Sequence, residues 1–140
     1  MSEIKITERG WAGHYICASR CRFRRNTLLE YRMRKIVVST VGAHFAYRPG
    51  EDEKMDTVGH ERWFETMAFE AYENGPYLDA DVTQSVDFES EWGVWADNIN
   101  KLPEAVDNIA NDMHEKIVQE IEMKLLASNG ELPKIIKDEL

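Results

Sequence analysis

The spacing of apolar residues changes near residue 100, and this change constrains the fold more than any other feature of the sequence. Up to about residue 90, short stretches alternate apolar and polar residues or are rich in β-branched side chains, which is typical of strands. From Pro103 onward, apolar residues recur every three or four positions, at Val106, Ile109, Ala110, Met113, Ile117, Ile121 and Leu125. A run of strands followed by helices predicts an α+β fold, with an antiparallel sheet of five or six strands followed by C-terminal helices. We expect a single domain over residues 1–140, strand-rich at 1–90 and helical at 91–140.

Local signals place several elements along the chain. The KIVVSTV stretch, Lys35–Val41, predicts a central strand, and a hairpin turn is expected around Tyr31–Arg34. Asn74-Gly75 predicts a second hairpin with a type I′ turn, because both residues tolerate positive φ. Residues 48–59 combine proline, two glycines and a charge run, which predicts an exposed loop. Shorter helices are expected at Trp92–Lys101 and Pro133–Leu140.

The net charge of −9 is distributed unevenly. Residues 1–50 hold ten Lys and Arg against three Asp and Glu, whereas residues 51–140 hold seven against twenty-three. An acidic protein repels nucleic acid as a whole, but a local basic strip can still hold a small anion. We therefore expect no long nucleic acid as a partner and favour a compact phosphate-bearing ligand.

The sequence gives no sign of membrane association or secretion. No apolar run approaches the roughly 18–20 residues that cross a bilayer, and the N-terminus lacks the basic head and apolar centre of a secretory signal. We expect a cytoplasmic protein with no membrane partner, whose two cysteines, Cys17 and Cys21, are free thiols.

Histidine and cysteine spacing does not favour a metal site. His14, Cys17 and Cys21 form an HxxCxxxC cluster, but no second ligand pair follows, and on a strand residue 14 points away from the other two. Motifs for a nucleophile, a phosphate loop or a dinucleotide fold do not occur. His114 lies one position past the apolar stripe and is expected to be a hydrogen-bonded helix residue. These observations predict a protein without catalytic residues, metal or cofactor.

The segment RCRFRRNTLLEY, residues 20–31, is the best candidate for anion binding. In an extended strand Arg20, Arg22 and Arg24 share one face, and guanidinium groups in line suit phosphate oxygens. Arg25, Asn26 and Thr27 add a further cation and neutral hydrogen-bonding groups. The alternative is that these arginines pair with the acidic second half of the chain.

Aromatic residues supply the second part of a nucleotide site. Phe88, Trp92 and Trp95 stand where the sheet is expected to give way to helices, and a base stacked on such a ring gains about 1–3 kcal/mol. For each ring alone, packing in the core is the simpler interpretation. The two features together predict one enclosed site, walled by arginines of the first fifty residues and by a ring at this junction.

Several segments resemble the first type of phage-encoded Thoeris anti-defence proteins. The resemblance rests on RGWAGHYI, CRFRRNTLLEY, WFETMAFEA and EWGVWADNINKLP and spans most of residues 9–127. It implies a protein that binds the cyclic ADP-ribose isomer made by bacterial TIR-domain enzymes and leaves it intact, acting in the cytoplasm of an infected bacterium. It also implies a homodimer or higher homo-oligomer, and in some members a second site for cyclic di- or trinucleotides.

The resemblance further implies roles for particular residues. The adenine would stack on Phe88 near Asn98, and Arg24, Arg25, Asn26 and Thr27 would serve phosphates or the cyclic-nucleotide site. The charged loop at 48–59 has no counterpart in this pattern. Two other functions stay open: an acidic inhibitor or decoy of a host nucleic-acid-binding protein, and a small hydrolase acting on the same signalling nucleotide.

Overall fold

The computed structural model describes residues 4–11, 13–14, 20–46, 50, 54–59, 61–98, 102–129 and 135–137. Within these residues the strands are β1 (Lys5–Glu8), β2 (Cys21–Tyr31), β3 (Arg34–Ala46), β4 (Lys54–Asp56), β5 (Arg62–Asn74), β6 (Tyr77–Val86), β7 (Gly93–Trp95) and β8 (Ile135–Lys137). The helical elements are the 3-10 segments η2 (Ala96–Asn98) and η3 (Pro103–Val106) and the α-helix α1 (Asp107–Ala127).

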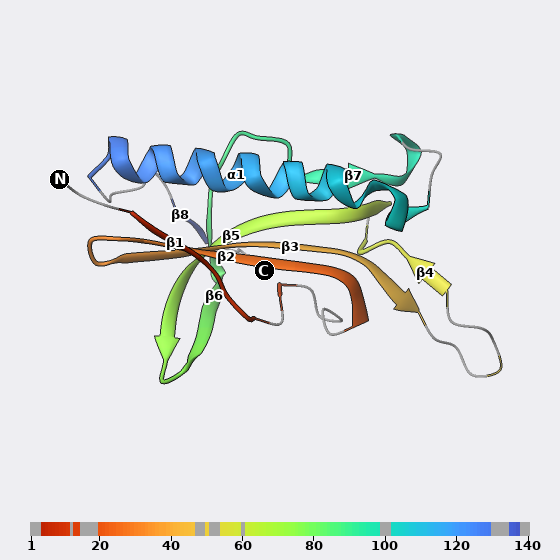
Figure 1. Ribbon diagram of the computed structural model, residues 1–140, viewed down its shortest axis with the longest axis horizontal. Helices are drawn as coiled ribbons and strands as arrows, with labels where there is room; N and C mark the ends of the chain where they lie inside the picture. The colour runs from red at the N-terminus through yellow and green to blue at the C-terminus, as the bar shows by residue number, and fades with distance from the viewer. Residues whose placement is uncertain are drawn as a thin grey trace.

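All of these strands belong to one antiparallel sheet, shown in Figure 1. Its order is β1-β2-β3-β5-β6-β8, with β4 paired to β3 and β7 paired to β5. The predicted α+β class and the antiparallel sheet are therefore confirmed. The expected count of five or six strands was too low, because the three-residue strands β4, β7 and β8 also join the sheet.

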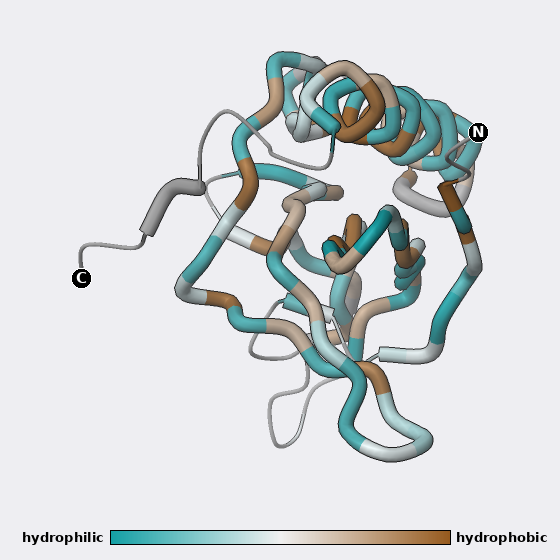
Figure 2. Tube along the Cα trace, turned by 90° about the vertical axis from the view of Figure 1, so that its left-hand side faces the viewer, coloured by the Kyte–Doolittle hydropathy of each residue, from teal (hydrophilic) through white to brown (hydrophobic). Residues whose placement is uncertain are grey.

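The helix α1 covers one face of the sheet, as Figure 1 shows. The core lies between them, where apolar side chains of β2, β3 and β5 meet those of the helix. Seen from the side in Figure 2, the sheet curls beneath the helix. The helical stripe predicted from the sequence is largely the buried face, but Ile109 is 41% exposed and belongs to the surface. His114, expected beside the stripe, lies within the buried face.

The opposite face of the sheet carries a second, smaller core. Leu28, Val37, Phe69, Leu78 and Ala80 form it, and the indole of Trp11 packs against them. Trp11 contacts Phe69 edge-on, with ring centroids 6.2 Å apart. The N-terminal segment therefore lies over the face that α1 does not cover, and both faces of the central strands are buried.

The structure corrects the prediction of several C-terminal helices. Residues Trp92–Lys101 were expected to be helical, but Gly93–Trp95 is strand β7, and only the 3-10 turn of η2 follows it. At Pro133–Leu140, residues 135–137 form strand β8, paired with β6. Both segments are too short to hold a helix away from the sheet, and backbone pairing with an available strand edge is the stronger interaction.

Both predicted hairpins are present, but one turn differs from expectation. The β2–β3 turn lies at residues 32–33, with Arg32 at φ 58°. In the β5–β6 hairpin only Gly75 has positive φ, at 63°, because Asn74 is still in β5 and pairs with Tyr77. The predicted type I′ turn was therefore wrong. The predicted loop at 48–59 also contains β4 and the buried Val58, so it is not wholly exposed.

In the described part of the chain, no helix is both long and apolar enough to cross a membrane.

Candidate functional site

A cavity opens where the neighbours of β5 change. Strand β7 pairs with residues 62–65 of β5, and β6 pairs with residues 69–74 after a register shift between Phe69 and Glu70. Residues 66–68 lie between these two paired stretches, and the loop from β6 to β7 passes beside them. The space enclosed is about 320 Å³, within the usual range of small-molecule sites. We call it the Phe88 cavity; it is lined by Arg62, Glu65, Thr66, Met67, Ala68, Ser85, Val86, Asp87, Phe88 and Trp92.

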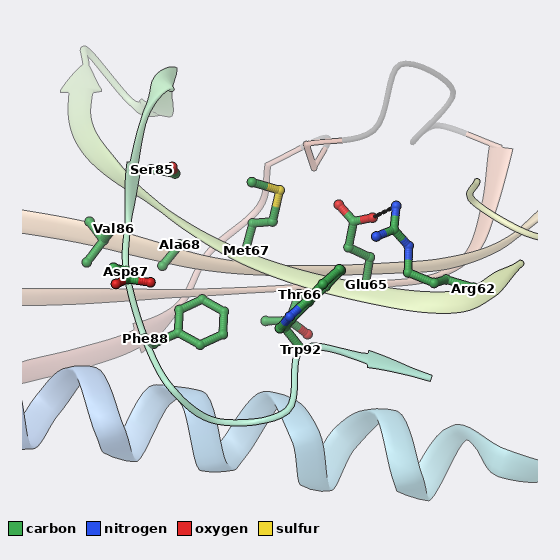
Figure 3. Close-up of a pocket in the computed structure, with 10 residues that line it drawn as sticks. All are labelled: Arg62, Glu65, Thr66, Met67, Ala68, Ser85, Val86, Asp87, Phe88 and Trp92. Carbon is green, nitrogen blue, oxygen red and sulfur yellow. Dashed lines mark ion pairs between the residues drawn. The ribbon is translucent and has the colours of Figure 1, made fainter. Parts of the chain in front are cut away.

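Aromatic rings and one cation meet in the Phe88 cavity, as Figure 3 shows. Phe88 lies on the α1 side of β5, whereas Glu65 and Met67 project from its other face. The guanidinium of Arg62 lies 4.9 Å from the ring centroid of Trp92 and pairs with Glu65 at 2.7 Å. A cation over an aromatic face adds polarity to a wall that would otherwise be apolar. The cavity therefore offers stacking surfaces next to both a positive and a negative group.

The backbone and a second ring hold Trp92 in place. The backbone N–H of Thr66 donates to the Trp92 carbonyl at 2.8 Å, and Trp95 contacts the Trp92 indole with centroids 5.3 Å apart. Trp92 is nevertheless 39% exposed. It forms the rim of the cavity, and a ligand could reach its free face.

Glu120 of α1 fixes the loop that carries Phe88. Its carboxylate accepts the backbone N–H groups of Glu89 at 2.6 Å and Ser90 at 2.8 Å, together with the Ser90 hydroxyl, and it pairs with Lys124. Burial disfavours the charged form, but the hydrogen bonds from Ser90, Lys124 and Glu89 outweigh it and lower the pKa of Glu120 to about 2. The loop is thus held by a permanently charged group on the helix. The sequence did not mark Glu120, which is one of many acids in its half of the chain.

His14 connects the N-terminal segment to the rim of the same cavity. Its Nε2 lies 3.1 Å from a Glu65 oxygen, and its Nδ1 lies 3.0 Å from the hydroxyl of Ser39. Ser39 is fully buried, so this serine–histidine–carboxylate arrangement has no exposed nucleophile. Its effect is to hold Glu65 in place.

A second cavity, of about 640 Å³, lies beside β1 and the end of the β5–β6 hairpin. We call it the Arg24 cavity; it is lined by Glu8, Arg9, Gly10, Trp11, Arg24, Arg25, Asn26, Tyr77 and Leu78. Within the described residues, Arg24 makes no hydrogen bond or ion pair. The Asn26 amide donates to the Trp11 carbonyl, while its own oxygen is buried with no donor among the described groups. An unpaired guanidinium and an open acceptor thus share one cavity wall with Tyr77, which is 72% exposed.

The remaining arginines of the RCRFRR segment have protein partners. Arg20 donates to the Phe45 carbonyl at 2.8 Å. Arg22 pairs with Asp107 at the start of α1. Arg25 pairs with Glu8 at 2.8 Å and with Glu115 of α1 at 2.5 Å. Burial opposes the charge on Arg25, but the hydrogen bonds that it donates to Glu8 and Glu115 raise its pKa above the ordinary value.

These contacts overturn the predicted guanidinium array. Arg22 turns toward α1, whereas Arg24 lines a cavity on the Trp11 side, so Arg20, Arg22 and Arg24 do not form a common anion site. The side chains of Arg22 and Arg24 do not share one face of β2, because the partner strand is irregular opposite Arg22. The facing residue of β3, Ala43, has φ 48° and is missing from the paired register.

The predicted single site is likewise divided in two. None of the arginines at 20–25 lines the Phe88 cavity, where Arg62 is the arginine present. Of the predicted ligand residues, Phe88 lies in one cavity, while Arg24, Arg25 and Asn26 lie in the other. Asn98 ends η2, and its side chain is outside the described residues. Arg62 could have been noticed in the sequence from its place beside Trp63 and Phe64, but nothing there connected it with Trp92.

A row of buried polar groups runs between the two cavities under α1. We call Thr27, Thr40, Thr66 and His114 the polar row. Both ring nitrogens of His114 lie 2.7 Å from hydroxyls, Nε2 from Thr27 and Nδ1 from Thr40. Burial, with help from the charge on Arg25, lowers the pKa of His114 to about 4, so the imidazole is neutral. The expectation that His114 is hydrogen-bonded is confirmed.

The cysteine and histidine cluster is only partly described. Cys21 is buried beside Val41 and Val58, whereas Cys17 lies outside the described residues. Among the residues that the structure does describe, no three His, Cys, Asp or Glu side chains converge as metal ligands.

Comparisons with known proteins give no match: neither a protein-family model, nor a curated protein, nor a solved structure matches the chain. The case for a function therefore rests on the two cavities and on the sequence segments quoted above.

Proposed function

We propose that this protein captures a small nucleotide and holds it without chemical change, and that the nucleotide is a cyclic ADP-ribose isomer. In this proposal the protein sequesters an immune signal in the cytoplasm of an infected bacterium. The observation that carries it is the Phe88 cavity, which the rings of Phe88 and Trp92 line together and where the guanidinium of Arg62 lies against the Trp92 ring.

Each part of such a ligand matches a group in this cavity. The rings of Phe88 and Trp92 offer surfaces on which a base can stack, which contributes about 1–3 kcal/mol per base. Carboxylates accept hydrogen bonds from ribose hydroxyls, and Asp87, which lines the cavity, is the candidate for this role. Arg62 lies over the Trp92 ring and is the first candidate for a phosphate oxygen.

The charged residues of the cavity indicate that it lacks positive charge for an anionic ligand. Arg62 is already paired with Glu65, and Asp87 adds a second negative charge. Tight capture of a dianion needs more positive charge than this cavity provides. We therefore include in the proposal a second copy of the chain, whose basic half supplies that charge and covers the exposed face of Trp92.

Retention and release of the ligand tests the proposal. The protein is mixed with the cyclic ADP-ribose isomer produced by a TIR-domain enzyme, freed of unbound ligand and denatured by heat, and the released material is analysed by mass spectrometry. Intact ligand in near-stoichiometric amount is the expected result. Chemically altered ligand would mean a hydrolase, and no retained ligand would favour the acidic inhibitor or decoy.

A pair of variants ties the result to the cavity. Phe88→Ala removes a stacking surface and is expected to lower the affinity roughly tenfold to a hundredfold. Tyr72→Ala removes an exposed aromatic ring that lines neither of the two cavities and is expected to retain ligand normally. Equal retention by both variants would place the ligand elsewhere.

A further inference from the structure

The polar row joins the two cavities by a continuous series of hydrogen bonds. At one end the hydroxyl of Thr27 donates to Glu8 at 2.7 Å, and Glu8 lines the Arg24 cavity. At the other end the hydroxyls of Thr40 and Thr66 are 2.6 Å apart, and Thr66 lines the Phe88 cavity. His114 bridges the two halves through its two ring nitrogens.

The direction of every hydrogen bond in the series follows from Glu8. An ionised carboxylate only accepts, so the single hydrogen of the Thr27 hydroxyl is committed to Glu8. Burial raises the pKa of Glu8, but hydrogen bonds from Arg25 and Thr27 outweigh it and lower that pKa, so Glu8 is ionised at neutral pH. The Thr27 oxygen can then only accept from His114, which must carry its proton on Nε2.

The other half of the series is fixed in the same way. With its proton on Nε2, neutral His114 presents Nδ1 as an acceptor, and the Thr40 hydroxyl must donate to it. The Thr40 oxygen then accepts from the Thr66 hydroxyl. All donors therefore point from the Phe88 cavity toward Glu8.

We propose that this series is a tautomeric relay through which the Glu8–Arg25 ion pair controls ligand capture in the Phe88 cavity. The proposal rests on the proposed function and adds a regulation of the same site. It requires two states that differ in the positions of the hydrogens of the row and in whether Glu8 contacts Thr27, and the chemistry of the row supplies both.

The second state arises when Glu8 leaves Thr27. The Thr27 hydroxyl then turns to donate to Nε2, His114 carries its proton on Nδ1, and the Thr40 hydroxyl turns toward Thr66. The number of protons is unchanged, since one leaves Nε2 for water and another reaches Nδ1 from water during a local opening of α1. The Thr66 hydroxyl then has no acceptor within the row, and because Thr66 is fully buried, a ligand oxygen must displace the side chains over it to accept from this hydroxyl.

This state is favoured by a ligand oxygen that reaches Thr66. Without such an acceptor the buried hydroxyl is left unsatisfied, at a cost of about 1–3 kcal/mol for a buried donor. The Glu8 contact and an acceptor at Thr66 therefore oppose each other. An anion in the Arg24 cavity that pairs with Arg25 and repels Glu8 strengthens capture in the Phe88 cavity, and linkage makes the effect reciprocal.

The charged groups that act on His114 come from three elements. Glu8 belongs to β1, Arg25 to β2, and Glu115 to the helix itself. Only Glu8 bonds directly to the row, so it is the residue to change. Glu30 gives a matched control, because it lies on the neighbouring strand β2 and pairs with Lys5 and Lys35, but no contact joins it to the row among the described residues.

Nitrogen-15 NMR of the imidazole distinguishes the two tautomers without any ligand. In the unaltered protein at pH 7 we expect His114 to be the Nε2–H tautomer alone. In Glu8→Ala we expect the Nδ1–H tautomer to become populated and the Thr66 amide resonance to shift. Glu30→Ala is expected to keep the unaltered spectrum at both positions.

The same variants are then tested with the cyclic ADP-ribose isomer as probe. Glu8→Ala is expected to bind it about threefold to tenfold more tightly than the unaltered protein, the value of one hydrogen bond, and Glu30→Ala with unchanged affinity. A gain of affinity is a result that simple structural damage does not produce.

Several results would overturn the relay. An Nδ1–H tautomer of His114 in the unaltered protein contradicts the derived hydrogen-bond direction. An unchanged tautomer population in Glu8→Ala contradicts it as well. If the His114 tautomer changes but the Thr66 amide resonance does not shift, or the affinity for the probe is unchanged, the polar row does not act on the Phe88 cavity. If no variant binds the probe, the proposed function fails, and the Thr66 resonance in Glu8→Ala still decides the relay.

Discussion

The carboxylate of Glu120 accepts hydrogen bonds from both the backbone N–H and the hydroxyl of Ser90. This contact joins the middle of α1 to the loop between β6 and β7, two residues after Phe88. Thr66 of β5 holds the end of this loop at Trp92, and the contact with Glu120 holds its middle to the helix. The geometry of the Phe88 cavity is thus set by a residue that does not line it.

Glu120→Gln should therefore affect both stability and ligand capture. The amide keeps the shape of the side chain but loses the charge that receives the loop N–H groups, and hydrogen bonds to charged groups contribute about 1.5–3 kcal/mol. We expect a loss of stability of about that size in urea unfolding and weaker retention of the cyclic ADP-ribose isomer. Glu122→Gln, on the same helix, serves as the control and should change neither. Normal retention in Glu120→Gln would show that the loop does not need this contact.

His114 should make the protein sensitive to acid. Its pKa is about 4 in the folded protein and about 6.5 when unfolded, so between these values the unfolded chain binds a proton that the folded chain does not. Stability from this group is complete above about pH 6.5 and falls as the pH drops toward 4, by about 1.4 kcal/mol per pH unit and about 3 kcal/mol in total.

Urea unfolding at several pH values measures this effect. The control is His114→Gln, which keeps one donor and one acceptor but does not titrate. The difference in stability between the two proteins should shrink steadily from pH 6.5 to pH 4. Parallel stability curves would mean that His114 is not buried in its neutral form.

Gly42 should tolerate no side chain. A Cβ built there would lie 2.0 Å from Cδ1 of Phe64, a fully buried ring at the centre of the core. Gly42→Ala should therefore destabilise the protein by about 1–3 kcal/mol or more, because the ring has to move. At Gly10 the same substitution meets no atom within 4 Å, and Gly10→Ala should change stability by less than about 0.5 kcal/mol. Equal stabilities in a thermal or urea melt would contradict the packing of Phe64 against β3.

Arg24→Glu should separate ligand binding from stability. Because Arg24 is exposed and has no ion pair in the described part of the chain, its reversal should leave the unfolding midpoint within experimental error. The resemblance implies a cyclic-nucleotide site at Arg24, so binding of a cyclic dinucleotide, measured by calorimetry, should weaken about tenfold to a hundredfold. The control Arg32→Glu makes the same charge change in the β2–β3 turn. If both variants lose binding equally, net charge and not the cavity is responsible.

The sequence predicted the class of the fold because its strongest patterns are local. The β-branched run at residues 35–41 forms the centre of β3, and the helical stripe from Ala110 to Leu125 is the buried face of α1. Both patterns report burial of one face of an element, which periodicity measures directly. Strands of three residues carry no such pattern, which is why β7 and β8 were mistaken for helices.

The candidate site was predicted less well, because it depends on interruptions of regular structure. The Phe88 cavity exists because the register shifts between Phe69 and Glu70, and Arg22 leaves the predicted face next to the positive φ of Ala43. Gly42, next to Ala43, is the one glycine at these positions, and no glycine or proline marks the shift between Phe69 and Glu70. Phe88 was predicted as a site residue because an aromatic ring at a junction is conspicuous, and it lines a cavity, whereas Glu120 and Thr66 resemble many other acids and threonines in the chain.

The position of His114 also has a consequence for the order in which the protein matures during synthesis. Thr27, Thr40 and Thr66 leave the ribosome well before the segment that covers them, since α1 begins at Asp107. Until then the face of the nascent sheet that α1 later covers is exposed to solvent, and water hydrates the three threonine hydroxyls. Translation of the last quarter of the chain is therefore the step that removes water from this side, and a ribosome stalled before residue 107 would display a sheet that chaperones can still bind.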